Sequence, residues 1–283
     1  MVALLPVFEA SSLLVAQQSE AKGWVPTPRP GDDYLSRRVL VSAPRLRVIS
    51  KWGIGVDGID LEAADELGIA VFNTPGVFGE ELADYAMGYI HMLARRQHEV
   101  NARVKAGEWY QVRGVSLAGR TLGIVGLGSS GRALARRASA ASMRVLGYDV
   151  VDVEVEGCEL VALDELLSRS DIVSLQLPVT PESKHLINEE ALRVMKDDAW
   201  LINISRGSLV DETALVAALE RGSIGAAALD VFESEPVSGS NPLLEFDNVI
   251  VGSHNGSNTD EAVTRTTQLA VATFAEGPEA ALR

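Results

Sequence analysis

Residues 122–149, LGIVGLGSSGRALARRASAASMRVLGYD, decide the fold of this chain. An apolar, strand-like run leads into a Gly-x-Gly-x-x-Gly turn formed by Gly126, Gly128 and Gly131, and a stretch of helical composition follows it. In a βαβ unit, such glycines permit a tight turn, a close approach of the backbone to a pyrophosphate, and close packing of the helix on the strand. The stretch therefore predicts a unit that binds a dinucleotide.

A carboxylate at the end of the second strand bears on which dinucleotide is bound. Asp149 follows Gly131 by 18 residues, and no Lys or Arg comes directly after it. A carboxylate at this place accepts hydrogen bonds from the ribose 2′-OH and would repel a 2′-phosphate, so the pattern predicts NAD rather than NADP. Free N–H groups at the start of the helix favour the phosphates, and Ser129 and Ser130, which lie there, are predicted to contact the cofactor.

Apolar runs alternate with helical stretches on both sides of this unit. Segments such as 130–141 and 211–221 have helical composition, and the longest helical stretch, 80–106, is interpreted as a connector between domains. Parallel strands need crossover connections, which are usually helices, so the alternation predicts an α/β fold with parallel sheets. The acidic segment 152–159 is interpreted as an exposed loop. The predicted strands are residues 46–50, 70–73, 121–125, 144–148, 171–175, 200–204, 226–229 and 249–251.

The length of the chain favours two domains. Single hydrophobic cores stop growing at about 250–300 residues, and this chain has 283. We predict two Rossmann-like, doubly wound parallel-sheet domains. The dinucleotide-binding domain is predicted to span 81–256. Residues 1–80 and 257–283 are predicted to form a discontinuous substrate-binding domain, because the C-terminal tail is expected to pack back on the N-terminal part.

Composition narrows the classes of partner. The net charge of -14 produces a field that repels phosphate backbones, so binding of nucleic acid is not expected. An anionic substrate must then be held by local cations or by backbone N–H groups. The single cysteine, Cys158, excludes an intrachain disulfide and a cysteine metal cluster, and it fits a reducing compartment. No metal is predicted.

The N-terminal stretch and the hydropathy of the chain predict a cytoplasmic protein. The first 20 residues, MVALLPVFEASSLLVAQQSE, lack a basic region and carry Glu9 within their apolar part, which is not typical of a signal peptide. No run of about 20 apolar residues without charge occurs, so no membrane span is expected.

Three later segments each place a polar side chain just after an apolar run. LINISRGSLVDE carries Arg206, LDVFESEP carries Glu235 and VGSHNGS carries His254. Ligands of a doubly wound sheet bind beyond the carboxyl ends of its strands, so these groups are expected to converge. An Arg can bind a carboxylate bidentately and polarise a carbonyl. A His can donate a proton to a developing alkoxide, while a Glu orients its ring and favours the protonated form.

In these motifs the chain resembles the D-isomer-specific 2-hydroxyacid dehydrogenases, and most closely their D-3-phosphoglycerate dehydrogenase-like branch. The resemblance runs from about Ser42 to about Thr267. It implies that Arg206, Glu235 and His254 are the catalytic residues. The segments that carry it are KWGIGVDGID, NTPG, GLGSSG, LQLPVTPESKHLIN, NISRGSLVDE, LDVFESEP and SHNGS.

The resemblance also implies contacts with the cofactor and a quaternary structure. Asp230 is expected to contact the nicotinamide amide, with Gly256 nearby, and Pro178 is expected to line the cofactor pocket. A homodimer joined mainly through the cofactor domains is implied as well.

The segment KWGIGVDGID resembles the substrate-carboxylate loop of the family. In that loop, N–H groups around Gly53, Ile54 and Gly55 are expected to grip an anion. Lys51 is hypothesised to contact a substrate phosphate, and the alternative is a simple surface lysine.

Taken together, these features predict an NAD-dependent oxidoreductase that transfers a hydride between nicotinamide and a small D-2-hydroxy or 2-keto acid, with 3-phosphoglycerate and phosphohydroxypyruvate among the candidates. Two alternatives stay open: an NAD(H)-binding sensor or scaffold of the corepressor type, and a catalytically impaired paralogue. The second arises because the substrate domain is unusually short, as if one helix and one strand were missing between PTPRPG and DDYLSRRVL. The other histidines, His91, His98 and His185, are interpreted as structural or surface residues.

Overall fold

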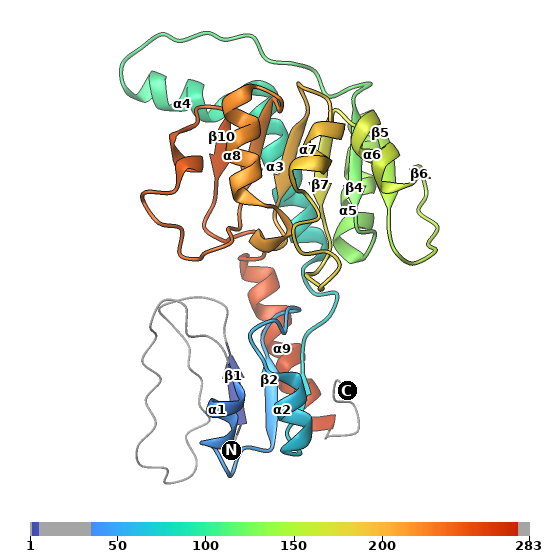
Figure 1. Cartoon of the computed structure of the whole chain (residues 1–283), viewed down its shortest axis with the longest axis vertical. Coiled ribbons are helices and arrows are strands. Elements are labelled where there is room, and N and C mark those ends of the chain that lie inside the picture. Colours follow the sequence, from blue (N-terminus) through green and yellow to red (C-terminus); the bar gives the residue numbers. More distant parts are fainter. Residues whose placement is uncertain (1, 6–34, 277–283) are drawn as a thin grey trace. The chain divides into compact units, whose positions relative to one another are not determined.

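The computed structural model describes residues 2–5 and 35–276, with side chains for residues 35–272. The chain divides into two compact units, both drawn in Figure 1. Each unit is formed around its own parallel sheet.

The larger unit is continuous and the smaller one is not. The larger unit comprises Phe78–Ser257, and the smaller unit combines Met1–Val77 with Asn258–Arg283. The predicted cofactor domain, 81–256, begins three residues later than the larger unit and ends one residue earlier.

The sheet of the larger unit has seven strands, and every neighbouring pair is parallel. Its order is β10-β9-β8-β7-β4-β5-β6, so the chain runs outward from β4 on one side and then returns to β7 on the other. A crevice for ligands forms beyond the carboxyl ends of the strands where such an order reverses. The strands are β4 (Thr121–Val125), β5 (Arg144–Tyr148), β6 (Cys158–Leu160), β7 (Ile172–Leu175), β8 (Trp200–Asn203), β9 (Ala226–Leu229) and β10 (Val249–Val251).

Helices cover both faces of this sheet. One face packs against α3 (Gly79–Arg95) and α5 (Ser129–Ala140), and their shared core includes Leu122, Ile124 and Leu134. The core of the other face contains residues of α6 (Leu163–Arg169), α7 (Glu189–Val194) and α8 (Glu212–Arg221). All five residues of β4 are buried, as expected for a strand covered on both faces. The α/β fold with a doubly wound parallel sheet is therefore confirmed for this unit.

All eight predicted strands are present, and four of them have the predicted bounds. The strand β6 was not predicted. It begins at the end of the acidic segment 152–159, which we interpreted as an exposed loop, so that interpretation was wrong in part. β6 pairs with β5 at the edge of the sheet, and Cys158 lies so close to Gly147 that a Cβ there would be 2.6 Å from the Cys158 sulfur. An edge strand of three residues needs no long apolar run, so composition gave little sign of it.

The predicted long helix is two helices. α3 ends at Arg95, Arg96 adopts a left-handed conformation with φ of 50°, and α4 (Gln97–Lys105) begins directly afterwards. α4 has no buried residue, whereas α3 buries eight. The helix turns away where its apolar face ends, because a polar segment gains nothing by continuing along the core.

The smaller unit shows a three-stranded parallel sheet among its described residues, in the order β1-β2-β3. β1 (Val2–Leu5) was not predicted. β2 (Val48–Lys51) overlaps the predicted run 46–50 and ends one residue beyond it, and β3 (Ala70–Phe72) lies within the predicted run 70–73. The C-terminal helix α9 (Asp260–Glu276) packs on this N-terminal sheet, and the Ser50 hydroxyl donates to the Ala270 carbonyl oxygen at 3.1 Å. Two short helices, α1 (Arg37–Val41) and α2 (Leu61–Glu66), complete the described part.

Two predictions fall mainly on residues outside the described ranges. The absence of a signal peptide concerns residues 1–20, and the loss of a helix and a strand concerns the junction of PTPRPG and DDYLSRRVL. Within the described part, no helix is long and apolar enough to cross a membrane. No group of three or more His, Cys, Asp or Glu there could hold a metal ion.

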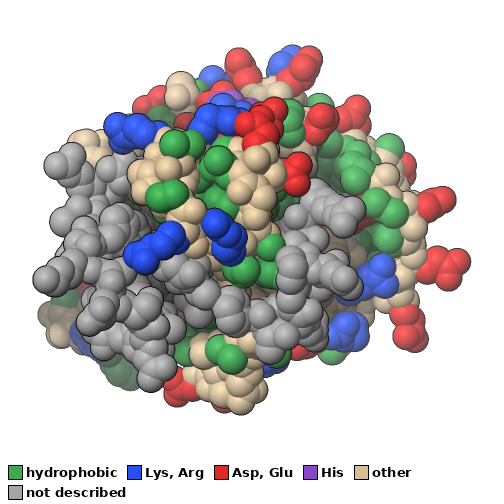
Figure 2. All heavy atoms as spheres, turned by 90° about the horizontal axis from the view of Figure 1, so that it is seen from below, with side chains coloured by type: hydrophobic (Ala, Val, Ile, Leu, Met, Phe, Trp, Pro, Cys, Tyr) green, Lys and Arg blue, Asp and Glu red, His purple; other side chains and the backbone are tan. Residues whose placement is uncertain are grey.

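Acidic and basic side chains lie side by side on the surface. Figure 2 shows Asp and Glu side chains mainly along the upper and right-hand borders of the drawn face, with Lys and Arg side chains among them. Many Arg side chains are paired with carboxylates: Arg137, for example, contacts both Glu80 and Asp84 at the α3–α5 contact, at 2.8 and 2.6 Å.

Candidate active site

The glycine turn joins β4 to α5 at the carboxyl edge of the sheet. Gly126 has a φ of 96°, and a Cβ on it would lie 2.6 Å from the Gln176 carbonyl oxygen. A Cβ on Gly131 would lie 2.0 Å from the Gly126 carbonyl oxygen. A Cβ on Gly128, in contrast, would meet no atom within 4 Å. The first and third glycines are therefore required for close packing, while the second faces open space.

The open space beside Gly128 has the features that a pyrophosphate requires. α5 begins at Ser129, directly after Gly128, and no side chain caps it. The first N–H groups of the helix therefore remain for an anion, which the helix dipole also favours. Ser129 is exposed and Ser130 is half-buried at this end. The residues present thus fit the phosphates of a dinucleotide.

Two predicted cofactor residues lie at the ends of β5 and β7, the two strands that flank β4. Asp149, after β5, accepts hydrogen bonds from the Leu127 N–H at 2.7 Å and from the Val151 N–H at 3.0 Å. Each carboxylate oxygen has two lone pairs, so one on each remains for ribose hydroxyls. Pro178, after β7, is exposed at the same edge of the sheet.

Arg206 follows β8 in a turn that two side chains hold. The Asn203 side chain accepts from the Ser205 N–H at 3.1 Å and donates to the Arg206 carbonyl oxygen at 2.8 Å. The Ser205 hydroxyl donates to the Leu175 carbonyl oxygen of β7 at 2.8 Å. No function was predicted for Asn203 or Ser205 from the sequence. The available signal was an Asn at a strand end, since such side chains often bond to the backbone two residues on.

The turn that carries Arg206 packs backbone to backbone against the loop after β9. Gly207 begins the short helix η1 (Gly207–Leu209), and a Cβ on it would lie 1.8 Å from the Phe232 carbonyl carbon. No side chain can occupy that space. Gly207 therefore sets the separation of the segment with Arg206 from the loop with Glu235.

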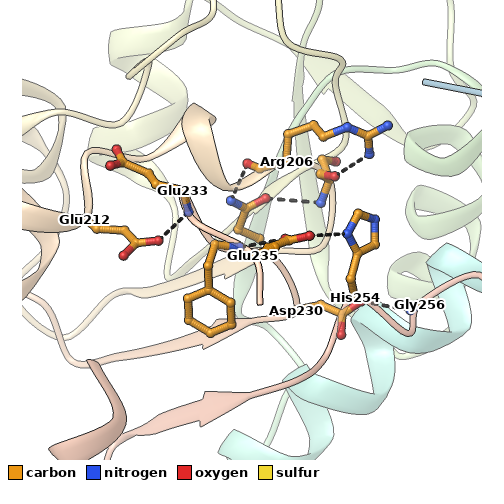
Figure 3. Close-up of polar contacts among 10 residues, drawn as sticks. Arg206, Glu212, Asp230, Glu233, Glu235, His254 and Gly256 are labelled. Carbon is orange, nitrogen blue, oxygen red and sulfur yellow. Dashed lines mark hydrogen bonds and ion pairs between the residues drawn. The ribbon is translucent and has the colours of Figure 1, made fainter. Parts of the chain in front are cut away.

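Glu235 and His254 form a direct pair, as shown in Figure 3. The His254 Nδ1 and the Glu235 Oε2 are 2.7 Å apart, and the other oxygen of Glu235 accepts from the Phe232 N–H at 2.9 Å. The third predicted residue, Arg206, lies across the loop from this pair (Figure 3). The structure therefore brings the three predicted catalytic side chains together at one edge of the larger unit.

The electrostatics of the pair keep Glu235 ionised. Burial opposes the charged form, but the hydrogen bond and charge of His254, the Phe232 N–H and the Arg206 charge together hold the pKa of Glu235 below its ordinary value. The carboxylate therefore stays negative at neutral pH beside the His254 ring. The ring nitrogen that bonds to Glu235 is Nδ1.

Asp230 is buried beneath the turn of His254. Its carboxylate accepts from the Gly256 N–H at 2.8 Å, and its carbonyl oxygen accepts from the His254 N–H at 2.7 Å. The hydroxyls of Tyr85 and Tyr89, on α3, lie 3.2 and 3.4 Å from the carboxylate. Burial raises the pKa of Asp230, although these hydrogen bonds to backbone N–H groups and to Tyr85 work in the opposite direction.

His254 has a left-handed backbone with φ of 56°, a conformation that persists only where surrounding contacts hold it. The hydrogen bonds of Asp230 to the His254 and Gly256 N–H groups are such contacts. The predicted contact of Asp230 with nicotinamide stays a prediction. Tyr85 and Tyr89 were missed as site residues, because at helical spacing among apolar residues they are indistinguishable from core positions.

The predicted substrate loop lies in the smaller unit, directly after β2. Lys51 ends the strand, and Gly53 has a φ of 122°. The Gly53 N–H donates to the buried Thr74 hydroxyl at 2.9 Å, so this donor shapes the loop itself. The Asn73 side chain also donates to the Ile54 carbonyl oxygen at 2.8 Å. Anion binding by Ile54 and Gly55 stays a prediction.

Comparisons with known proteins match this chain to one family. The family model described as "D-isomer specific 2-hydroxyacid dehydrogenase, NAD binding domain" matches residues 87–256. A glyoxylate reductase of Thermofilum pendens is 43% identical over 249 residues, which cover 84% of this chain and 74% of that protein. A D-3-phosphoglycerate dehydrogenase of Methanocaldococcus jannaschii is 44% identical, over 81% of this chain but 45% of that protein.

A solved structure shows the same fold. The D-lactate dehydrogenase of Aquifex aeolicus, complexed with NAD and lactic acid, has a TM-score of 0.79 and 35% identity, and the match covers 86% of this chain and 80% of that one. The family model and such neighbours support NAD as the cofactor.

Replacing Asp149 tests its role in cofactor choice. We expect Asp149→Ser to weaken NADH binding at least about tenfold, because hydrogen bonds to a charged group contribute about 1.5–3 kcal/mol. Binding of NADPH should weaken less or improve, since the repulsion of the 2′-phosphate is removed. Fluorescence titration with both cofactors measures this. The exposed Asp152, changed to Ser, is the control, and equal losses in the two variants would contradict the assignment.

Proposed function

The chain belongs to the D-isomer-specific 2-hydroxyacid dehydrogenase family, and on that premise we propose that it reduces glyoxylate with NADH. As a member it is an NAD-dependent oxidoreductase that moves a hydride between nicotinamide and a small D-2-hydroxy or 2-keto acid. The matched relatives are enzymes, which supports this interpretation and not the alternatives of a sensor or an impaired paralogue.

One observation carries the proposed chemistry: the 2.7 Å contact between His254 and an ionised Glu235. Reduction of a keto acid requires a proton for the oxygen that becomes the alkoxide. An imidazole whose protonated form is stabilised by a carboxylate is suited to supply it. The roles of all three residues remain proposals, supported by this geometry.

The relatives and the chemistry of the substrate favour glyoxylate. Three relatives named glyoxylate reductase are 42–43% identical, and the matches cover 74–78% of their lengths. Glyoxylate is the smallest 2-keto acid, so it needs a carboxylate anchor and a proton donor but no pocket for a long side chain. Arg206 and the N–H groups of Ile54 and Gly55 are the proposed anchors, since the Gly53 N–H already donates to Thr74.

In the proposed mechanism the residues of this chain bind, orient and protonate the substrate. NADH, when bound, supplies the hydride. Arg206 holds the substrate carboxylate and polarises the carbonyl. His254 gives its proton to the carbonyl oxygen as the hydride arrives, and Glu235 stabilises the ring before the transfer. In the opposite direction His254 accepts the proton from the hydroxyl.

The first test is oxidation of NADH by the purified chain with a panel of 2-keto acids. We expect turnover above about 1 per second with glyoxylate, and lower kcat/KM with pyruvate and longer keto acids. Turnover confined to another acid would contradict glyoxylate but not the family chemistry. Binding of NADH without turnover of any acid would contradict the proposed function as a whole.

Variants of the proposed proton donor test the mechanism. His254→Gln should lower kcat by about 10²–10⁴-fold, the range typical of a lost general acid, with little change in NADH binding. Because the pKa of Glu235 is held below its ordinary value, reduction by the unaltered chain should persist into mildly acid pH and fall only as Glu235 is protonated. Glu235→Gln has no carboxylate to protonate, so its kcat/KM should be low throughout and should lack this acid fall. The same acid fall in both chains would contradict the pair.

Lys51 supports a second candidate substrate, phosphohydroxypyruvate. This Lys ends β2 next to the proposed anion loop, and a matched relative is named D-3-phosphoglycerate dehydrogenase. If Lys51 binds a phosphate, Lys51→Ala should raise KM for phosphohydroxypyruvate at least about tenfold and leave KM for glyoxylate unchanged, since only the former loses a charged hydrogen bond. A KM that is unchanged for every phosphorylated acid would exclude this contact.

We propose that the chain forms a homodimer through the segment of α4 and residues 106–116. α4 buries no residue, and the Trp109 that follows it is 88% exposed. A large apolar side chain in that position favours coverage by a partner. We expect a dimer by light scattering, and weaker dimerisation for Trp109→Ser than for Val104→Ser. A monomeric unaltered chain would contradict this proposal.

The cytoplasm is the proposed compartment. Burial, with a smaller effect of Glu159, raises the pKa of the Cys158 thiol to about 11. The one cysteine of the chain is therefore a protonated, unreactive thiol at neutral pH, as is common in reducing compartments.

A further inference from the structure

Glu235 lies on a loop that regular structure does not hold. β9 ends at Leu229, and the next element, η2 (Pro242–Glu245), begins 13 residues later. The bond from the Phe232 N–H to Glu235 shapes the loop but does not attach it to the rest of the unit. A misplacement of about 1 Å can lower a rate by about 10²-fold. Other contacts must therefore fix this loop.

Glu233 supplies two such contacts on the side of the loop that faces away from His254, as Figure 3 shows for Glu212 and Glu233. The Glu233 N–H donates to the Glu212 carboxylate at 2.6 Å, and the Glu233 carboxylate lies 2.6 Å from the His185 Nε2. The second oxygen of Glu212 accepts from the Asn241 side chain at 2.9 Å, so one carboxylate connects both ends of the loop.

His185 connects this loop to the segment of Arg206. Its backbone N–H donates to the Ser208 carbonyl oxygen at 2.8 Å, while its ring contacts Glu233. His185 has a φ of 51°, and two residues later Ile187 forms two backbone hydrogen bonds, with Leu209 and Asp211, that keep this segment beside η1. One residue thus contacts both segments that carry proposed catalytic groups.

We propose that Glu212 and His185 are positioning residues, which act through Glu233 to hold Glu235 against His254 at a fixed distance from Arg206. The proposal rests on the catalytic roles proposed above for Glu235 and His254. It assigns a function to two residues outside the predicted site, one of which, His185, we interpreted from sequence as structural or surface.

A purely structural role would give different results. The His185 and Glu233 side chains are 39% and 37% exposed, and exposed ion pairs contribute little to stability. Asp211, not Glu212, caps α8 by accepting from the Ala214 N–H at 3.0 Å. Loss of either positioning residue should therefore lower kcat with little change in the melting temperature.

The main variant is Glu212→Ala, with Glu212→Gln as its conservative partner. Gln keeps an acceptor for the Glu233 N–H, whereas Ala removes it. We expect Glu212→Ala to lower kcat for glyoxylate about tenfold, with KM and the affinity for NADH changed less than twofold, and Glu212→Gln to recover most of the rate. Glu220→Ala, which removes an exposed carboxylate of the same helix, should equal the unaltered chain.

The pH profile separates positioning from structure. Burial raises the pKa of Glu235, while the charges of His254 and Arg206 lower it. When Glu235 is no longer held beside these two groups, its pKa should rise, so the acid fall of the rate should begin at higher pH in Glu212→Ala than in the unaltered chain. A rate within twofold of the unaltered chain, or a tenfold loss with an unchanged profile, would overturn the proposal.

A second pair of variants keeps the test valid if Glu212→Ala does not fold. His185→Asn preserves the left-handed backbone, which Asn adopts readily, and removes the ring. His185→Asn and Glu233→Ala should each lower kcat about threefold, and the double variant no further, because both remove the same contact. Additive losses would overturn the assignment of His185. An inactive unaltered chain would instead contradict the proposed function itself.

Discussion

The parallel direction of the seven strands is the constraint on which the site depends. Because every neighbouring pair is parallel, each strand must end at the same edge before the chain crosses back through a helix. The turns after β4, β8 and β9 therefore lie at one edge, although they are far apart in the sequence. The positions of the strand ends alone bring the glycine turn, Arg206 and Glu235 to that edge.

The larger unit was predictable from local patterns. β4, β5, β9 and β10 have the expected bounds, because a strand buried on both faces is a continuous apolar run between turn residues. The glycine turn was predictable from its local spacing as well, and Gly126 and Gly131 answer steric demands that the structure displays. Placement of Arg206, Glu235 and His254 at one edge followed from strand ends alone, while the roles given to them came from the resemblance to a family.

Other features of the fold and of the site leave no local pattern in the sequence. The break at Arg96 depends on where α3 runs out of a core to cover, which no local residue reports. β6 is stabilised by pairing with a single neighbour, and its residues are partly exposed. Tyr85, Tyr89 and Asn203 support the site through hydrogen bonds across elements, and each has an ordinary local explanation. Support of this kind is a property of tertiary structure.

The contact at Gly207 has a consequence for how the site can evolve. Two backbones meet there with no side chain between them. The separation of the Arg206 turn from the Glu235 loop therefore does not depend on side-chain rotamers. Backbone contacts change little when neighbouring loops are redesigned or diverge. Selection could therefore alter residues elsewhere at the site while the separation of these two backbone segments stays fixed. A substitution of Gly207 would place a Cβ in that space, so position 207 itself is closed to change.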